Sequence, residues 1–298
     1  MKLGTRGSQL ARWQAEWVRS RVAAQGARAE IVVIKTRGDA EVDRPLHELE
    51  GKGFFTKEIE DALLDGRIDV AVHSLKDLPT TLPKGLVLGA IPTRHDPREA
   101  LVNGTSLLEL KAGVRVGTSS LRRIAQVRFL RPDVDVVPLR GNVPTRVRKV
   151  ETHDGLDAAL LAIAGLERLG LGGKGSVIDP FDVMPAPGQG ALGIEIRADD
   201  SATRKALEPL HDFASAIAVT AERALLAALG GGCQAPVAAW VGARDTGHGT
   251  RLYGRVTERD GAVQLTASAD IDQSAPERAG ETVARLLESE GAASLLAR

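Results

Sequence analysis

Serine, threonine and arginine side chains gather where a predicted strand gives way to a predicted helix, in the segment 114–123 (VRVGTSSLRR). Backbone N–H groups and the positive dipole end at the start of a helix form a site for an anion, and hydroxyl groups add donors. Two arginines in the first helical turn oppose that dipole, so their position is unfavourable unless a negative group lies nearby. The segment therefore predicts an anion site at Thr118, Ser119, Ser120, Arg122 and Arg123. A serine cap, by Ser119 or Ser120, is expected in either case, and the alternative to a ligand is that both arginines lie in solvent.

The same pattern recurs at two other strand ends. Arg140 and Arg146 flank a Gly-Asn turn before a further helix, and Arg6 and Ser8 follow the first strand. Residues 115–149 contain nine basic and two acidic residues, a local net charge of +7 in a chain whose formal net charge is zero. Eight of the nine are arginine, whose planar guanidinium binds a carboxylate or phosphate through two parallel hydrogen bonds. The pattern favours an anionic ligand. A solvated basic face and a nucleic-acid surface are the alternatives, although aromatic residues make up only 3% of the chain.

One carboxylate and one thiol are candidates for covalent chemistry. Asp77, with Lys76 beside it, follows a predicted buried strand, where it is either an acid–base group or half of a surface ion pair. His73, four residues earlier, is interpreted as a packed polar residue. Cys233 is the only cysteine, and it follows three glycines on a permissive loop. It is either a small core residue or a nucleophile activated by nearby arginines. The six histidines show no metal-ligand spacing, so no metal site is predicted.

An alternation of strands and helices must position these residues, and it indicates α/β domains. Helices are predicted after Ser8 and Thr56, ending at Gly26 and Gly66. Strands are predicted over residues 31–34, 68–72, 114–117, 134–137, 156–162 and 191–196. After residue 213, a long Ala/Leu helix, three strands (237–241, 251–256 and 263–270) and a terminal helix (281–287) favour a small α+β domain.

Two proline-containing segments, 92–97 and 185–190, are predicted crossings between domains. The predicted domains are 1–92 with 190–209, then 97–185, then 213–298. A chain that leaves its first domain and later returns to it is expected to enclose a ligand cleft between two lobes.

The 298 residues, 43% hydrophobic and 26% charged, have the composition of a globular protein. No apolar run approaches the ~20 residues that span a bilayer. The first residues lack the apolar core of a signal peptide, so we expect a cytoplasmic protein.

Seven motifs resemble, in order and over nearly the whole chain, those of the porphobilinogen deaminase (hydroxymethylbilane synthase) family. They are 5–11 (TRGSQLA), 51–58 (GKGFFTKE), 71–79 (AVHSLKDLP), 117–123 (GTSSLRR), 139–142 (LRGN), 187–190 (PGQG) and 222–233, which begins with Glu-Arg and ends with Gly-Gly-Cys. As a set they are highly specific. The fold that the resemblance implies is α/β, with two lobes like type II periplasmic binding proteins, a discontinuous first domain and a small C-terminal α+β domain carrying the cysteine.

The resemblance implies a transferase of tetrapyrrole and haem biosynthesis. It would deaminate four porphobilinogen units and join them head to tail on a dipyrromethane cofactor, bound by a thioether to Cys233, before hydrolysis releases hydroxymethylbilane. Asp77 matches the catalytic carboxylate. Residues matching cofactor-binding positions are Ser8, Lys76, Thr118, Ser119, Ser120, Arg122, Arg123, Arg140 and Arg146; those matching substrate-binding positions are Arg6, Lys52, Phe55, Arg140, Arg146, Arg168 and Gln189. We expect a monomer, with no metal, nucleic acid or membrane partner.

The sequence departs from the family pattern at two places. Glu48 and Glu50 precede the 51–53 segment, where some members carry a basic residue, which leaves the contacts of that loop open. Pro144 restrains a turn that varies in the family and bears on the position of Arg146. The competing interpretation is a two-lobed solute- or anion-binding protein without catalysis, which gives no role to Asp77 or Cys233.

Overall fold

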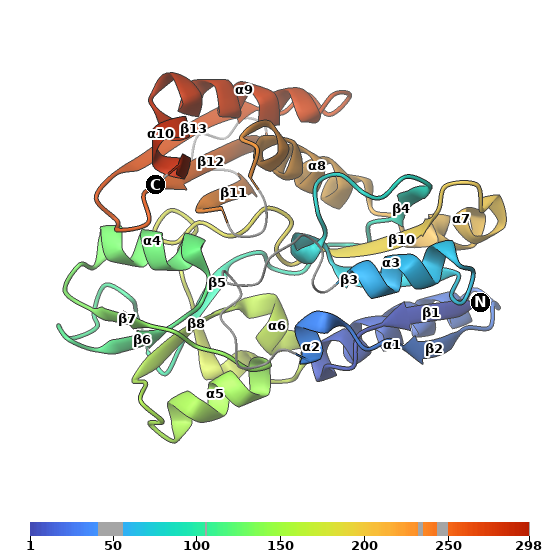
Figure 1. Cartoon of the computed structure of the whole chain (residues 1–298), viewed down its shortest axis with the longest axis horizontal. Coiled ribbons are helices and arrows are strands. Elements are labelled where there is room, and N and C mark those ends of the chain that lie inside the picture. Colours follow the sequence, from blue (N-terminus) through green and yellow to red (C-terminus); the bar gives the residue numbers. More distant parts are fainter. Residues whose placement is uncertain (41–55, 105, 232–234, 243–249, 298) are drawn as a thin grey trace. The chain divides into compact units, whose positions relative to one another are not determined.

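The computed structural model describes residues 1–40, 56–104, 106–231, 235–242 and 250–297 (Figure 1). The chain divides into two compact units: Met1–His95 with Gly190–Ala216, and Asp96–Gln189 with Ile217–Arg298. The chain leaves the first unit within the predicted segment 92–97 and returns to it at the end of 185–190, so the first unit is discontinuous.

The first unit contains a five-stranded mixed sheet in the order β2-β1-β3-β10-β4. The first three strands of that order are parallel, whereas β10 runs antiparallel to both of its neighbours. The strands are β1 (Lys2–Thr5), β2 (Glu30–Val33), β3 (Val70–Ser74), β4 (Leu86–Ala90) and β10 (Leu192–Arg197). The sequence predicted β2, β3 and β10 to within two residues and implied a first strand before Arg6, but it missed β4.

Two helices cover opposite faces of this sheet because side chains along a strand alternate between its faces. Val70 and Val72 of β3 share a core with α1 (Gln9–Ala24), and Ala71 shares one with α3 (Lys57–Leu64). Ser8 caps α1 by accepting a hydrogen bond from Ala11 N, as predicted. The remaining helical segments are α2 (Arg37–Ala40), α7 (Ser201–Leu207) and the 3₁₀ turns Leu75–Asp77 and Glu208–Leu210.

The second unit begins with an equivalent sheet, in the order β7-β6-β8-β5-β9. Here β6, β7 and β8 are parallel, and β5 is antiparallel to β8 and β9. The strands are β5 (Glu99–Val102), β6 (Arg115–Gly117), β7 (Asp135–Val137), β8 (Ala158–Ala162) and β9 (Gly175–Val177); the helical segments are α4 (Leu121–Leu130), α5 (Val143–Glu151), α6 (Ile163–Arg168) and the 3₁₀ turn Gly172–Lys174. Each of the two sheets thus includes an antiparallel strand that adjoins a crossing of the chain.

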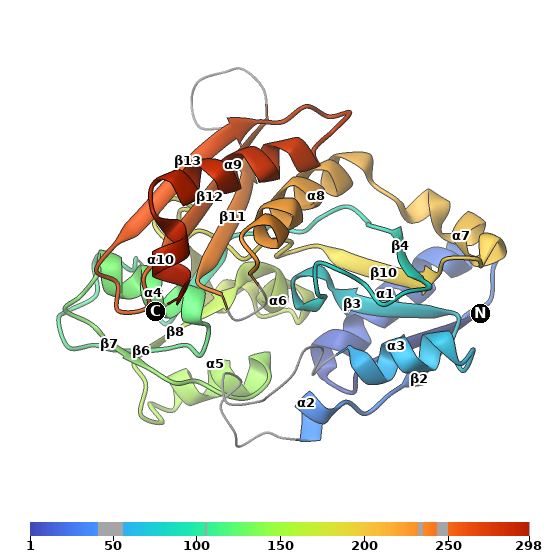
Figure 2. The same ribbon diagram turned by 45° about the horizontal axis from the view of Figure 1, so that its top comes forward.

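The C-terminal part has its own core, formed by a three-stranded antiparallel sheet and helices (Figure 2). Its elements are α8 (Phe213–Ala228), β11 (Val237–Gly242), β12 (Arg251–Thr257), β13 (Gln264–Asp270), α9 (Glu277–Ser289) and α10 (Ala292–Ala297). Leu225 of α8 packs with Val283 and Leu287 of α9 in that core. The expected class, two α/β lobes followed by a small α+β domain, is confirmed. The exact three-domain boundaries stay a prediction.

Candidate active-site pocket and arginine cluster

A small cavity of about 60 Å³ lies in the first unit, where β1 and β3 end. The carboxyl ends of neighbouring parallel strands meet at one edge of a sheet, which is where ligand sites of α/β folds concentrate. The cavity is lined by Arg6, Ser8, Leu10, Ala11, Gln14, Thr56, Val72, His73, Ser74 and Asp77. The structure therefore brings together Arg6, Ser8 and Asp77, three of the predicted site residues, although 69 positions separate Ser8 from Asp77 in the numbering.

Local hydrogen bonds fix the two turns that carry these residues. The Thr5 hydroxyl donates to Ala11 O at 3.0 Å, and the Ser8 hydroxyl accepts from Ala11 N at 3.2 Å, so the turn into α1 is held at both ends. After β3, the Leu75 backbone N–H donates to Ala191 O at 3.0 Å, and Leu75 is buried. Residues 75–77 form a 3₁₀ turn, in which the Leu78 N–H donates to Leu75 O at 3.2 Å, and Asp77 lies half-buried at the cavity.

Sequence reasoning missed two polar residues of this pocket. Gln14 is buried and donates from Nε2 to the Ser74 hydroxyl at 2.9 Å, which ties α1 to the end of β3. His73 is buried, as predicted for a packed polar residue, but it also lines the cavity and contacts Glu195 of β10. The available signal for Gln14 was a glutamine on the buried face of α1. For the contact of His73 with Glu195, the sequence offered no local signal.

In the second unit, the predicted anion segment joins β6 to α4. Ser120 occupies the N-cap of α4, but its side chain makes no capping hydrogen bond, so the expected serine cap is wrong. The Ser119 hydroxyl instead donates to Leu139 O at 2.9 Å and accepts from Leu139 N at 3.0 Å. Ser119 therefore ties the end of β6 to the end of β7, because parallel strands present both ends at one edge of the sheet.

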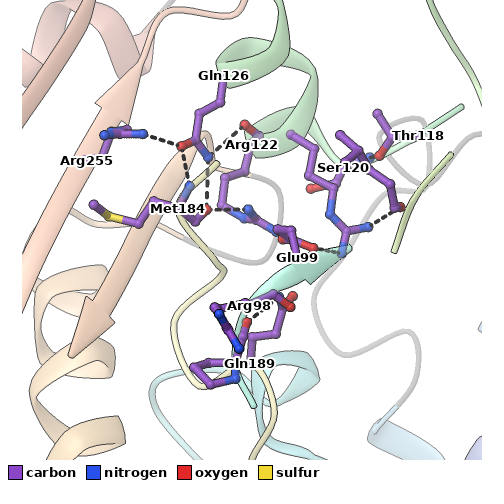
Figure 3. A network of polar contacts seen from close by, with 12 residues as sticks. Arg98, Glu99, Thr118, Ser120, Arg122, Gln126, Met184, Gln189 and Arg255 are labelled. Atoms are coloured by element: carbon purple, nitrogen blue, oxygen red, sulfur yellow. Dashed lines mark hydrogen bonds and ion pairs between the residues drawn. The ribbon is translucent and has the colours of Figure 1, made fainter. Parts of the chain in front are cut away.

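Arg122 and Arg123 converge on one buried carboxylate, Glu99 of β5. Figure 3 labels Arg122 and Glu99 of this group. Their Nη2 atoms lie 2.6 and 2.7 Å from the two Glu99 oxygens, and all three residues are at most 5% exposed. Arg122 also donates to Met184 O, and Arg123 to Leu160 O. Burial lowers the pKa of Arg122, and the charge of Glu99 opposes that shift. Glu99 thus accounts for the two arginines in the first turn, which are not in solvent. Their assignment to the cofactor stays a prediction.

The remaining predicted arginines of this unit follow β7 and β8: Arg140 comes after β7, Arg146 lies in α5, and Arg168 ends α6. Asn142 caps α5 by accepting from Thr145 N at 2.9 Å, and Pro144 fits the first turn of that helix. Arg146 is half-buried and donates from Nε to Gly141 O at 2.7 Å, so the proline is compatible with an ordered Arg146. Arg140 is half-buried after β7. Arg168 ends α6 at 6% exposure, and burial lowers its pKa to about 10.

Gln126 joins the second lobe to the C-terminal sheet (Figure 3). Its Oε1 accepts hydrogen bonds from Met184 N at 2.8 Å and from the buried Arg255 of β12 at 3.0 Å. Arg255 also donates to Phe181 O at 2.9 Å. Gln189, predicted to bind substrate, is buried and donates to Pro97 O at 2.7 Å within the same unit. The bonds of Gln126 and Arg255 connect the C-terminal sheet to the second lobe, and both regions belong to the same compact unit.

Three predicted site residues, Lys52, Phe55 and Cys233, lie outside the described residues, as do Glu48 and Glu50. Lys76 lies in the 3₁₀ turn beside Asp77 and is half-buried, and Thr118 is buried at the end of β6. Within the described ranges, no group of three or more His, Cys, Asp or Glu side chains is arranged to hold a metal ion. The same ranges contain no helix that is both long and apolar enough for a bilayer crossing.

Two family models match the chain. One, described as "Porphobilinogen deaminase, dipyromethane cofactor binding domain", matches residues 1–205, and the other, "Porphobilinogen deaminase, C-terminal domain", matches residues 216–289. A porphobilinogen deaminase of Moorella thermoacetica is 48% identical over 301 residues, covering 99% of this chain and 95% of that protein. One from Syntrophotalea carbinolica is 47% identical over 304 residues, covering 100% and 95%.

Among solved structures, the methionine-binding protein MetQ aligns with a TM-score of 0.44 and 15% identity, covering 72% of this chain and 93% of that chain. The order and direction of the strands, rather than this alignment, support the two-lobed α/β description.

Proposed function

The chain belongs to the porphobilinogen deaminase family, and from this premise we propose that its Asp77 pocket and its arginine-bearing strand ends carry the family's chemistry. The enzyme is a transferase, hydroxymethylbilane synthase (EC 2.5.1.61), which deaminates four porphobilinogen units and joins them into a linear tetrapyrrole. The observation that carries the residue assignment is the shared cavity of Arg6, Ser8 and Asp77. A solute-binding protein without catalysis is not favoured, because the family is enzymatic.

Asp77 is proposed as the catalytic carboxylate. Its half-buried position at a cavity allows a fixed negative charge to stabilise the cationic methylene carbon that remains when ammonia leaves porphobilinogen. Arg6 and the Ser8 hydroxyl, at the same cavity, are proposed to bind an acidic side arm of the substrate. Lys76, Arg168, Gln189, Lys52 and Phe55 are proposed as further binding residues from the family pattern alone.

The residues at the ends of β6 and β7 fit a cofactor that carries several carboxylates. Ser119, Ser120, Arg140 and Arg146 are half-buried there, and hydroxyl and guanidinium groups are the donors that carboxylates require. The buried Nε of Arg123 has no hydrogen-bond partner among the described residues, which leaves a donor for an acidic group. When bound, dipyrromethane supplies the free pyrrole carbon to which the first substrate unit is joined. Thr118, Arg122, Lys76 and Ser8 complete the proposed cofactor-binding set.

Cys233 is proposed to hold the cofactor through a thioether. The support is the family pattern, the match to a cofactor-binding domain, and the fact that the chain has no other cysteine. Intact-mass measurement of the active enzyme tests this: the mass should exceed that of the chain by two pyrrole units, and Cys233→Ser should remove the excess. An active enzyme with the mass of the bare chain would contradict the linkage.

The assignment of Asp77 has a separate test. Asp77→Asn should retain the excess mass, because the thioether does not involve Asp77, yet it should lower kcat by roughly 10²-fold or more, since the amide carries no charge. Near-normal turnover in Asp77→Asn would remove Asp77 from the mechanism.

We further propose that the enzyme acts as a cytoplasmic monomer on a small-molecule substrate, without a nucleic-acid or membrane partner. Composition and the small substrate support this. Light scattering during gel filtration tests the oligomeric state. A mass near 31.5 kDa supports a monomer, and a multiple of that mass would contradict it.

A further inference from the structure

Three titratable side chains are buried together in the first unit, behind the Asp77 pocket. They are Glu60 of α3, His73 of β3 and Glu195 of β10, with exposed fractions of 6%, 5% and 0%. His73 Nε2 lies 3.2 Å from Glu195 Oε2, across 122 positions of sequence. Of the three, His73 also lines the cavity that contains Asp77.

The sheet explains why these side chains meet. Ala71 of β3 packs against α3, and the period of two places His73 on the same face. Glu195 lies opposite Ala71 in the antiparallel β3–β10 pair, so it also points toward α3. Glu60 approaches that face from α3, whose Ile59, Ala62 and Leu63 form an apolar core there.

Burying these ionisable groups among apolar side chains lowers the stability of the fold. Burial, and next the charge of Glu195, raise the pKa of Glu60. The Oε1 atoms of Glu60 and Glu195 have no hydrogen-bond partner among the residues that the structure describes. Apolar side chains at such positions are often equally or more stabilising, so stability gives no reason for the cluster. Buried ionisable groups beside a pocket are instead candidates for a role in its chemistry.

Glu195 determines how the imidazole is presented to the pocket. A carboxylate only accepts hydrogen bonds, so Nε2 of His73 carries the hydrogen that faces Glu195, and in the neutral ring Nδ1 is the acceptor. The hydrogen bond that the structure shows for the His73 ring joins Nε2 to Glu195. The charged groups around His73 are Glu195 on β10, Glu60 on α3, and Arg6 and Asp77 at the cavity. The arrangement resembles the carboxylate–imidazole pair of general-base catalysis.

We propose that His73, oriented by Glu195, accepts the proton that is released from the attacking pyrrole carbon each time two porphobilinogen units are joined. The proposal rests on the role proposed for Asp77 and gives the two residues different roles. Asp77 stabilises the cation, and His73 removes the proton.

The atoms and electrons of the step balance without an oxidant or reductant. The bond between the methylene carbon and the ammonium nitrogen of porphobilinogen breaks, and its electron pair leaves with that nitrogen as ammonia. An electron pair of the preceding pyrrole ring forms the new carbon–carbon bond. The C–H bond at the attacking carbon then breaks, its electron pair restores the aromatic ring, and Nδ1 of His73 takes the proton. Glu195 balances the charge of the resulting imidazolium, which later loses the proton to water or ammonia.

His73→Gln tests the proposal because glutamine retains a polar group at the pocket but cannot take up a proton. General-base catalysis contributes about 10²–10⁴-fold, so kcat should fall by about 10²-fold or more. Porphobilinogen deuterated at its free α-carbon should then show a larger isotope effect on kcat than in the unmodified enzyme, because C–H cleavage becomes rate-limiting. His211→Gln is the matched control: His211 is a half-buried histidine of the same unit that accepts a hydrogen bond from Ile91 N, and its substitution should leave the isotope effect unchanged.

Two results would overturn the role of His73. One is a kcat within a few-fold of the unmodified enzyme; the other is a loss of kcat without any increase in the isotope effect, which indicates a purely structural role. The proposal for Asp77 fails differently. Single-turnover release of ammonia should be slow in Asp77→Asn but nearly unaffected in His73→Gln, so the two failures are distinguishable.

The orientation of the ring has a readout that does not depend on turnover. Nitrogen-15 NMR of the imidazoles, with His73→Gln to identify the signal, should show His73 with its hydrogen on Nε2. In Glu195→Gln the new amide can donate to Nε2, which favours the tautomer with hydrogen on Nδ1 and should lower kcat in parallel. An unchanged tautomer and unchanged kcat in Glu195→Gln would remove Glu195 from the proposal.

Discussion

The buried carboxylate of Glu99 provides the sharpest test of how the second unit is held together. In Glu99→Gln, Arg122 and Arg123 keep their backbone acceptors, Met184 O and Leu160 O, but lose the negative charge between them. Removing one partner of a buried ion pair costs about 3–5 kcal/mol. The glutamine oxygen retains one neutral hydrogen bond worth about 1 kcal/mol. We therefore expect the free energy of unfolding to fall by about 2–4 kcal/mol.

Trp240 allows the second unit to be followed alone, since Trp13 and Trp17 lie in the first unit. Urea unfolding is measured by fluorescence with Trp13 and Trp17 replaced by Phe in every protein compared. Asp135→Asn, in the same unit, serves as the control. Its pair with Arg115 spans 3.7 Å with both side chains at least half exposed, so its loss should cost less than about 1 kcal/mol.

An unfolding free energy of Glu99→Gln equal to that of Asp135→Asn would refute the reasoning, because two buried guanidinium groups would then need no carboxylate. Raising the salt concentration should leave the loss caused by Glu99→Gln nearly unchanged, since a buried pair is screened far less than an exposed one.

Two further predictions concern the first unit and the C-terminal core. Because burial raises the pKa of Glu60 above its usual 4.5, the folded protein binds more protons, and the free energy of unfolding should fall as pH rises from 4.5 through the raised pKa. Glu60→Gln should make the free energy of unfolding nearly independent of pH in that range, as measured by urea unfolding at several pH values. The same pH dependence in the variant and in the unmodified protein would contradict the prediction. A Cβ at Gly280 would lie 2.5 Å from Leu225 N and 2.6 Å from Ala221 O, so Gly280→Ala should cost about 1–3 kcal/mol. Gly173→Ala, with no atom within 4 Å of its Cβ, should be nearly neutral, and equal urea midpoints would disprove the close contact of α8 with α9.

Local patterns in the sequence determined much of the molecule. The cap at Ser8 and the apolar period after it fixed α1, and continuous apolar runs predicted β3 and β8. The position of Asp77 beside Arg6 was also within reach, because neighbouring parallel strands deliver their following turns to one edge of a sheet. The family resemblance was carried by those same turns, which is why it could be stated from the residues alone.

Three short strands were not predictable in the same way. β4, β5 and β9 are short and carry no alternating pattern, so only their neighbours identify them as strands. Glu99 stands in one of them, and nothing local indicates that it would neutralise Arg122 and Arg123. Sequence reasoning inferred an anionic ligand at these arginines, which stays a prediction, and did not find this protein carboxylate.

The pairing of His73 with Glu195 shows most clearly what tertiary structure alone decided. The sequence shows a histidine at the end of one strand and a glutamate in another, 122 positions apart. Whether they meet depends on the direction and register of β10 against β3, and a shift of one residue would turn Glu195 to the opposite face of the sheet. Residue types and local spacing thus determined which groups were available for chemistry, whereas strand order and register, which depend on the packing of distant segments, decided which of them came into contact.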